Sequence, residues 1–80
     1  MTRLYHNRNW KIEVFGREHG VPHFHLRWPD GRASIDMETF EVIIGNPPAD
    51  ILAEARAWAN ENRALIRSEW NKLNRESIRR

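Results

Sequence analysis

The sequence contains no cysteine. Disulfide frameworks, thiolate zinc sites and thiol catalysis are therefore excluded, and a small fold without disulfides fits a reducing compartment, so we expect a cytoplasmic protein. Long hydrophobic runs are also missing. No stretch approaches the roughly 18 apolar residues of a membrane-spanning helix, and the first residues lack the apolar core of a signal peptide. We therefore expect no membrane insertion.

The sequence also contains few lysines and has a small net charge. Of 13 basic residues only Lys11 and Lys72 are lysines, and the net charge of +2 is far below that of a protein that compacts DNA. The chain does have enough apolar content to fold, because 40% of its residues are hydrophobic and four are Trp. Eighty residues allow one domain with a small core, which we assign to residues 1–80.

Alternating apolar and polar residues in the first half predict antiparallel strands. Three alternating segments and a short segment rich in β-branched residues are expected as strands, at about 10–15, 23–28, 33–38 and 40–44. Asp30-Gly31, between the second and third segments, favours a two-residue hairpin turn because both residue types tolerate positive φ. The pattern therefore predicts a β-meander of three or four strands.

That turn fixes which residues face one another across the second hairpin. It places His25 opposite Asp36 and His23 opposite Glu38, so each imidazole meets a carboxylate. For the first hairpin the pattern fixes only which residues share a face, and one allowed register places Glu13 opposite His25. In that register His25 would lie between two acidic residues.

The second half predicts one long helix over about 48–75. Its apolar residues fall on one arc at 100° per residue, and no Gly or Pro follows Pro48, although Asn60 and Asn62 favour a kink. The expected fold class is α+β, an antiparallel three- or four-stranded β-meander with one long C-terminal helix packed on its apolar face. Such a helix would be ~40 Å long, against ~20 Å for a six-residue strand.

The far half of this helix would overhang the sheet and expose Leu65, Ile66, Trp70 and Leu73. A two-fold homodimer would cover this apolar stripe, since the same stripe on two chains can pack against itself. The alternative is a bend near Asn60 to Asn62 that folds the second half back over its own sheet.

The polar face of the predicted sheet is the place where chemistry could occur. A histidine flanked by carboxylates can act as a general acid or base on RNA. In this interpretation the catalytic candidates are His25, His23, Asp36 and Glu13. Lys11 and Arg27, which share the face, would hold phosphate groups of the nucleic acid.

Other interpretations of the same face stay open. His23 and His25 point the same way on one strand, and together with His19 or Glu38 they could ligate a divalent metal such as zinc. No other cofactor is expected. The face could also contact a partner protein, or it could form cross-strand ion pairs on a solvated sheet surface.

Two segments carry a resemblance to a known family. Glu18-His-Gly-Val-Pro-His-Phe-His-Leu26 and a helix with Trp58, Asn62, Leu65 and Trp70 resemble small bacterial proteins grouped as domain of unknown function 4160, over residues 10–73. The resemblance implies gene arrangements that look like toxin–antitoxin pairs, and hence a cognate small partner protein. It implies no activity and no catalytic residue.

The strand with His23 and His25, the following hairpin and the helix are also similar to the later part of HicA-type toxins. Those proteins cleave messenger RNA with a histidine on a strand. The function favoured at this stage is therefore a toxin–antitoxin-like or regulatory module that acts on RNA through the histidine face, and whether it is an enzyme stays open. The alternative is a non-enzymatic module that binds protein or dimerises through its C-terminal helix.

Overall fold

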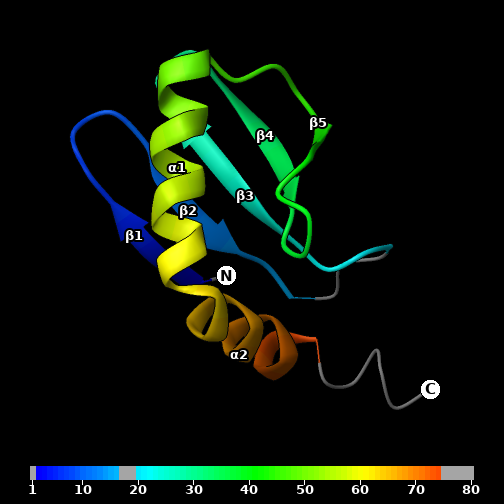
Figure 1. The fold of residues 1–80 in the computed structure, drawn as a ribbon. Helices are drawn as coiled ribbons and strands as arrows, with labels where there is room; N and C mark the ends of the chain where they lie inside the picture. Colours follow the sequence, from blue (N-terminus) through cyan, green and yellow to red (C-terminus); the bar gives the residue numbers. More distant parts are fainter. Residues whose placement is uncertain (1, 17–19, 75–80) are drawn as a thin grey trace.

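A computed structural model describes residues 2–16 and 20–74 of the chain, which form an antiparallel sheet with two helices on one face (Figure 1). In chain order and in sheet order the strands are β1 (Thr2–His6), β2 (Lys11–Val14), β3 (His23–Trp28), β4 (Gly31–Asp36) and β5 (Val42–Ile44). The helices are α1 (Ala49–Glu61) and α2 (Arg63–Leu73). The α+β class and the meander are confirmed, whereas the predicted numbers of strands and helices are wrong.

Strand β1 was not predicted because a β-bulge interrupts its alternation. Arg3 pairs with Glu13, but Tyr5 pairs with Ile12, so Leu4 is an extra residue in the ladder. Leu4 and Tyr5 consequently both pack against the core, although they are neighbours in sequence. A segment with two consecutive core residues does not show the period of two that marks a strand.

The turn between β3 and β4 lies one residue earlier than predicted. Trp28 pairs with Gly31, so Pro29 and Asp30 form the turn. Pro29 has the fixed φ that suits the first central position of a type I turn, and Gly is favoured at the fourth. Gly31 does not have the positive φ that the predicted turn requires. The third predicted strand, 33–38, therefore begins and ends two residues earlier, at 31–36.

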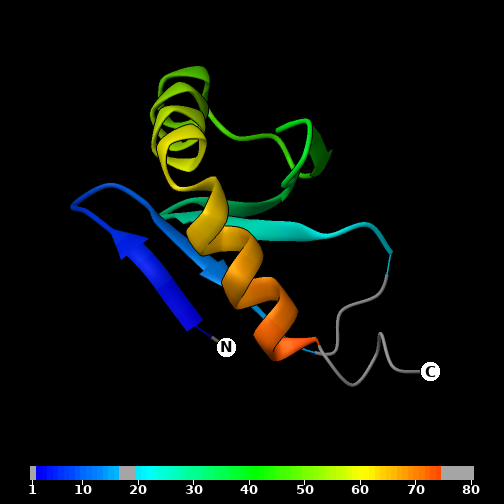
Figure 2. The ribbon, with the colours of Figure 1, turned by 60° about the horizontal axis from the view of Figure 1, so that its bottom comes forward.

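The predicted single helix over 48–75 is broken at Asn62, where the backbone leaves helical geometry with φ −128°. The Asn62 backbone N–H donates to the carbonyl of Ala59 at 3.1 Å, and its Nδ2 donates to the carbonyl of Trp58 at 2.8 Å. These bonds occupy carbonyls at the end of α1 and allow the chain to turn. Figure 2 shows α2 leaving the axis of α1 and returning over the sheet.

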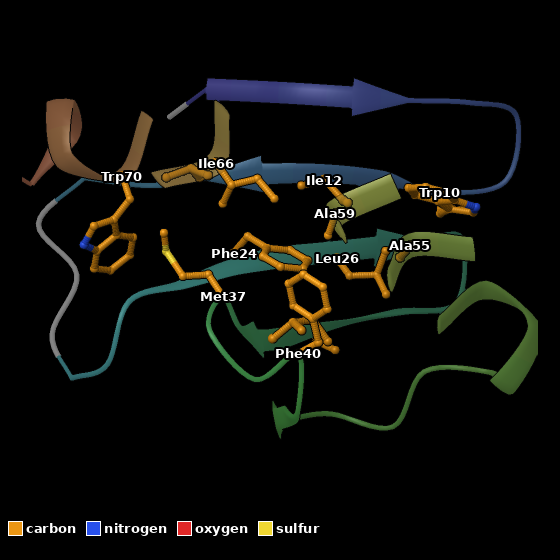
Figure 3. Close-up of a cluster of buried hydrophobic side chains, with 13 residues drawn as sticks. Trp10, Ile12, Phe24, Leu26, Met37, Phe40, Ala55, Ala59, Ile66 and Trp70 are labelled. Carbon is orange, nitrogen blue, oxygen red and sulfur yellow. The ribbon is translucent and has the colours of Figure 1, made fainter. Parts of the chain in front are cut away.

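Both helices contribute to a single core on one face of the sheet. Ala55 and Ala59 from α1 and Ile66 and Trp70 from α2 are buried against apolar side chains of the sheet (Figure 3). The core residues from the strands and turns are Trp10, Ile12, Val14, Phe24, Leu26, Ala33, Ile35, Met37 and Phe40. The polar residues that alternate with these core residues along the strands lie on the other face of the sheet, which we call the open face.

The exposed stripe predicted for the C-terminal helix is therefore largely covered by the chain itself. Only 1% of Ile66 and 6% of Trp70 is exposed, whereas Leu65 is exposed and Leu73 is half-buried. The bend at Asn62 was the alternative to the homodimer, and it is the arrangement found. The expectation that all four residues are available to a partner is wrong for Ile66 and Trp70.

Within residues 2–16 and 20–74, neither α1 nor α2 combines the length and apolar character that crossing a bilayer would need.

Candidate functional site

The open face brings four of the polar residues into one line across the sheet. Arg3 pairs with Glu13, Glu13 with His25, and His25 with Ser34. Cross-strand partners share a face and place their Cβ atoms about 5 Å apart. The predicted pairing of Glu13 with His25 is confirmed. The predicted pairing of His25 with Asp36 is wrong, because the shifted turn moves the register by two residues.

Glu13 is the most deeply buried polar residue on this face, with only 1% of its surface exposed. Its Oε2 lies 3.9 Å from Nζ of Lys11, and its Oε1 lies 3.6 Å from Nη1 of Arg27. Oε1 accepts no hydrogen bond from the described residues. The carboxylate is thus held under two cations by charge rather than by a complete set of hydrogen bonds, which is a costly arrangement for a buried anion.

His23 is buried where α2 meets the sheet. Its strand partner is Asp36, not Glu38 as predicted. Its Nδ1 lies 2.8 Å from the carbonyl oxygen of Val21, and its ring centroid lies 5.2 Å from that of Trp70. These contacts fix the imidazole between β3 and α2 and give His23 a packing role at this end of the sheet.

His25 is more accessible than His23 and lies in the middle of the open face. It is half-buried, and its ring makes edge contacts with Phe15 at 4.6 Å and with His23 at 5.1 Å between centroids. With Glu13 and Ser34 on its two sides, His25 is the candidate histidine with polar neighbours on both adjacent strands.

Asp36 organises the turn that follows β4. Its Oδ1 accepts hydrogen bonds from the backbone N–H groups of Glu38 at 2.7 Å and Thr39 at 3.0 Å. The turn ends with Phe40 at φ 65°, an uncommon conformation for a residue with a Cβ. Strand pairing therefore places Glu13 with His25 and Asp36 with His23, and the rings of the two histidines contact each other.

The predicted ligands of a metal ion do not gather into a cluster in the part of the chain that is described. No group of three His, Asp or Glu side chains there is placed to hold a metal. Glu38 forms an ion pair with Arg67 of α2, and His19 lies outside the described residues. Zinc binding by His23 and His25 stays a prediction, which calorimetry against a variant lacking both histidines would test.

A row of basic residues next to this line was not fully predicted. His6 pairs with Lys11, Lys11 with Arg27, and Arg27 with Arg32, so these side chains cross four adjacent strands on the open face. We call His6, Lys11, Arg27 and Arg32 the cation row. Sequence reasoning found Lys11 and Arg27 but missed the outer two. The missing β1 hid His6, and the wrong turn register moved Arg32 into a loop.

The β1–β2 loop and the β3–β4 turn lie at the same end of the sheet (Figure 1). The cation row borders a hollow at this end. The hollow has a volume of about 460 Å³. We call it the basic hollow, and its lining is Arg3, His6, Asn7, Arg8, Asn9, Trp10, Lys11, Arg27, Trp28 and Pro29. Sequence reasoning missed it because it needs β1 as one wall.

Glu13 balances only part of the positive charge around the cation row and the basic hollow. In the described ranges, Arg3, Arg8 and Arg32 form no ion pair with an acidic side chain, and all three are exposed. Like charges directly opposite one another on adjacent strands are destabilising. The row Lys11–Arg27–Arg32 therefore costs stability in the isolated protein, and an anion bound over it would remove that cost.

Comparison with known proteins gives a family but no activity. The model of a family described as "Domain of unknown function (DUF4160)" matches residues 9–71. No curated protein and no solved structure matches the chain. The matched region contains the open-face residues of β2, β3 and β4, together with α1 and most of α2. The chain belongs to the DUF4160 family.

Proposed function

We propose that this protein binds RNA through the open face of its sheet, with the cation row on the phosphate backbone. The observation that carries the proposal is the alignment of Lys11, Arg27 and Arg32 on three adjacent strands. The buried carboxylate of Glu13 lies within 4 Å of Lys11 and Arg27. Four strands at 4.7–4.9 Å spacing make the row about 14 Å wide. A row of this width spans more than one phosphate of an extended strand.

The residue types in the row fit phosphate recognition. Arginine presents a planar set of donors that matches two phosphate oxygens at once, and backbone contacts of this kind supply most of the affinity for nucleic acid. Glu13 supports the row by holding Lys11 and Arg27 from below. RNA bound there would lie directly beside His25.

His25 is the residue through which the bound RNA could be acted on chemically. It is half-buried next to Glu13, whose carboxylate is placed to orient the imidazole for general acid or base chemistry. Native protein that cleaves RNA, and a His25→Ala variant that binds RNA but does not cleave it, would establish a nuclease. Binding without cleavage by either protein assigns the module a regulatory role, including one within a toxin–antitoxin-like pair.

Contact with a partner protein through the C-terminal helix is the weaker alternative. Ile66 and Trp70 are buried in the chain's own core, which leaves Leu65 as the one exposed member of the proposed stripe. A partner that recognises this helix would therefore have to bind mainly polar side chains.

The test of RNA binding is its dependence on salt. Binding of a labelled single-stranded RNA should weaken steeply between about 50 and 200 mM salt, with a slope that falls by about 0.7 for each phosphate contact removed. Arg27→Gln and Arg32→Gln should each lower the affinity and the slope. Lys72→Gln, which removes one positive charge from α2, is the matched control and should change neither. Binding that is insensitive to both arginine variants would overturn the proposal.

A further inference from the structure

The basic hollow differs from the cation row in shape and in charge, although the two share His6, Lys11 and Arg27. From its lining we infer that the basic hollow holds the terminal phosphate of an RNA strand whose backbone lies on the cation row. This inference rests on the proposed function, and it assigns one end of the RNA to one end of the sheet.

Charge favours a terminal phosphate over a phosphate within the strand. A terminal monoester carries close to two negative charges near neutral pH, whereas a backbone diester carries one. Four cationic side chains line the hollow: Arg3, Arg8, Lys11 and Arg27. Of these, Lys11 and Arg27 already share the charge of Glu13. In the described part of the chain Arg3 and Arg8 are not engaged in ion pairs, so these two cations are available to balance the monoester.

The loop that carries Arg8 is held in place before any ligand binds. Oδ1 of Asn7 accepts hydrogen bonds from the backbone N–H groups of Asn9 at 2.8 Å and Trp10 at 2.9 Å. The Asn7 backbone N–H donates to the carbonyl of Trp10 at 2.9 Å, and Nε1 of Trp10 donates to Glu54 of α1 at 2.8 Å. A wall fixed in this way lowers the entropy lost when a ligand is bound.

The opposite wall offers an apolar surface for the sugar or base next to the phosphate. It consists of Trp28 and Pro29, and Trp28 is half-buried with its ring packed against Gly31. Aromatic rings are common stacking surfaces for unpaired bases. A volume of about 460 Å³ lies within the range of pockets that hold small ligands, so a nucleotide-sized group fits.

Two arginines allow the basic hollow and the cation row to be tested independently. Arg8 lines the hollow but is not part of the cation row, whereas Arg32 is part of the row but does not line the hollow. Both are exposed, and both lose one charge on replacement by Gln. Arg8→Gln therefore tests the terminal phosphate alone, and Arg32→Gln tests the backbone contact alone.

The experiment compares one RNA sequence in three forms, with a 5′-phosphate, with a 3′-phosphate and with neither. The full chain should bind one phosphorylated form about tenfold more tightly than the unphosphorylated RNA, as expected for one charge-assisted hydrogen bond. Arg8→Gln should abolish this preference and leave the affinity for unphosphorylated RNA unchanged. Arg32→Gln should weaken all three forms by a similar factor and keep the preference.

Equal affinity for all three forms, with salt-dependent binding intact, would overturn the terminal-phosphate site and leave the proposed RNA surface standing. No binding of any form would overturn both. A preference that Arg8→Gln does not change would place the terminal phosphate elsewhere and also reject the site. Adenosine monophosphate serves as a separate probe: if it binds in an Arg8-dependent way while RNA shows no end preference, the hollow is a site for free nucleotides instead.

Discussion

At the scale of single residues, Glu13 is where stability and proposed function oppose each other most directly. A carboxylate that is 1% exposed and has one oxygen without a hydrogen bond from the described residues is an expensive component of a small domain. Its presence is explained by the two cations above it, since Lys11 and Arg27 are direct cross-strand neighbours that would otherwise repel each other. Glu13 thus stabilises the positively charged surface formed by Lys11 and Arg27 and does not serve the packing of the core.

Replacement of Glu13 tests this interpretation. Glu13→Gln should lower the free energy of unfolding by about 1–2 kcal/mol at low salt, because Lys11 and Arg27 lose their shared counter-charge while staying partly solvated. The loss should shrink when salt is raised, since the remaining repulsion between the two cations is screened. Urea denaturation at low and high salt measures both effects. A loss that is independent of salt would mean that Glu13 contributes through packing.

Gly45 and Gly20 form a matched pair for a second prediction. Both have positive φ, but a Cβ on Gly45 would lie 2.6 Å from the carbonyl oxygen of Arg32, whereas a Cβ on Gly20 would have nothing within 4 Å. Gly20→Ala should therefore cost about 1 kcal/mol from backbone strain alone, and Gly45→Ala about 1–2 kcal/mol more because β4 must move away. Similar losses for the two variants would contradict the close approach of Gly45 to β4.

At the scale of elements, the break at Asn62 decides the shape of the molecule. A continuous helix would carry Ile66 and Trp70 past the end of the sheet, whereas the turn at Asn62 returns both to the core. The side chain of Asn62 stabilises the turn through its bond to the carbonyl of Trp58. Asparagine is suited to this position, because its short polar side chain bonds to nearby backbone more readily than it supports a helix interior.

Substitution of the two asparagines near the break should therefore have unequal effects. Asn62→Ala should lower the free energy of unfolding by about 1 kcal/mol, because it removes the bond to Trp58 and favours a continuous helix. Asn60→Ala is the control. Asn60 is exposed, and its one side-chain hydrogen bond within the described residues comes from Arg63 at the surface, so its loss should stay within about 0.5 kcal/mol. Equal effects in thermal denaturation would show that the break does not depend on Asn62.

At the scale of the whole molecule, sequence reasoning succeeded where periodicity alone decides structure. The alternation around Phe24 and Leu26 and the arc of apolar residues along the helices predicted one apolar sheet face under helix. It failed where a single residue changes the geometry: Leu4 inserts a bulge, and Pro29 moves a turn. Neither irregularity is visible in the hydrophobic pattern of its segment. Each one nevertheless determines which polar residues become neighbours on the open face.

The candidate site shows the same division. The pairing of Glu13 with His25 follows from strand parity and one register, and it was predicted. The cation row and the basic hollow depend on β1 and on the position of the β3–β4 turn, so they emerge only from the three-dimensional arrangement. Hydrophobic patterning predicts the layers of a small domain well, whereas local backbone irregularities determine its functional surface.

A negative charge on α2 should destabilise the core strongly at a buried position and hardly at all at an exposed one. Trp70 is 6% exposed against His23 and the sheet, whereas Leu65 is 45% exposed. Trp70→Glu should remove at least ~4 kcal/mol, since it buries a charge and leaves a cavity, and this approaches the total stability expected of an 80-residue domain. Leu65→Glu should change stability by less than about 0.5 kcal/mol. Circular dichroism and light scattering together distinguish this result from a dimer interface, because a Trp70→Glu variant that stays folded while its mass falls to 9.6 kDa would show that Trp70 is covered by a second chain instead.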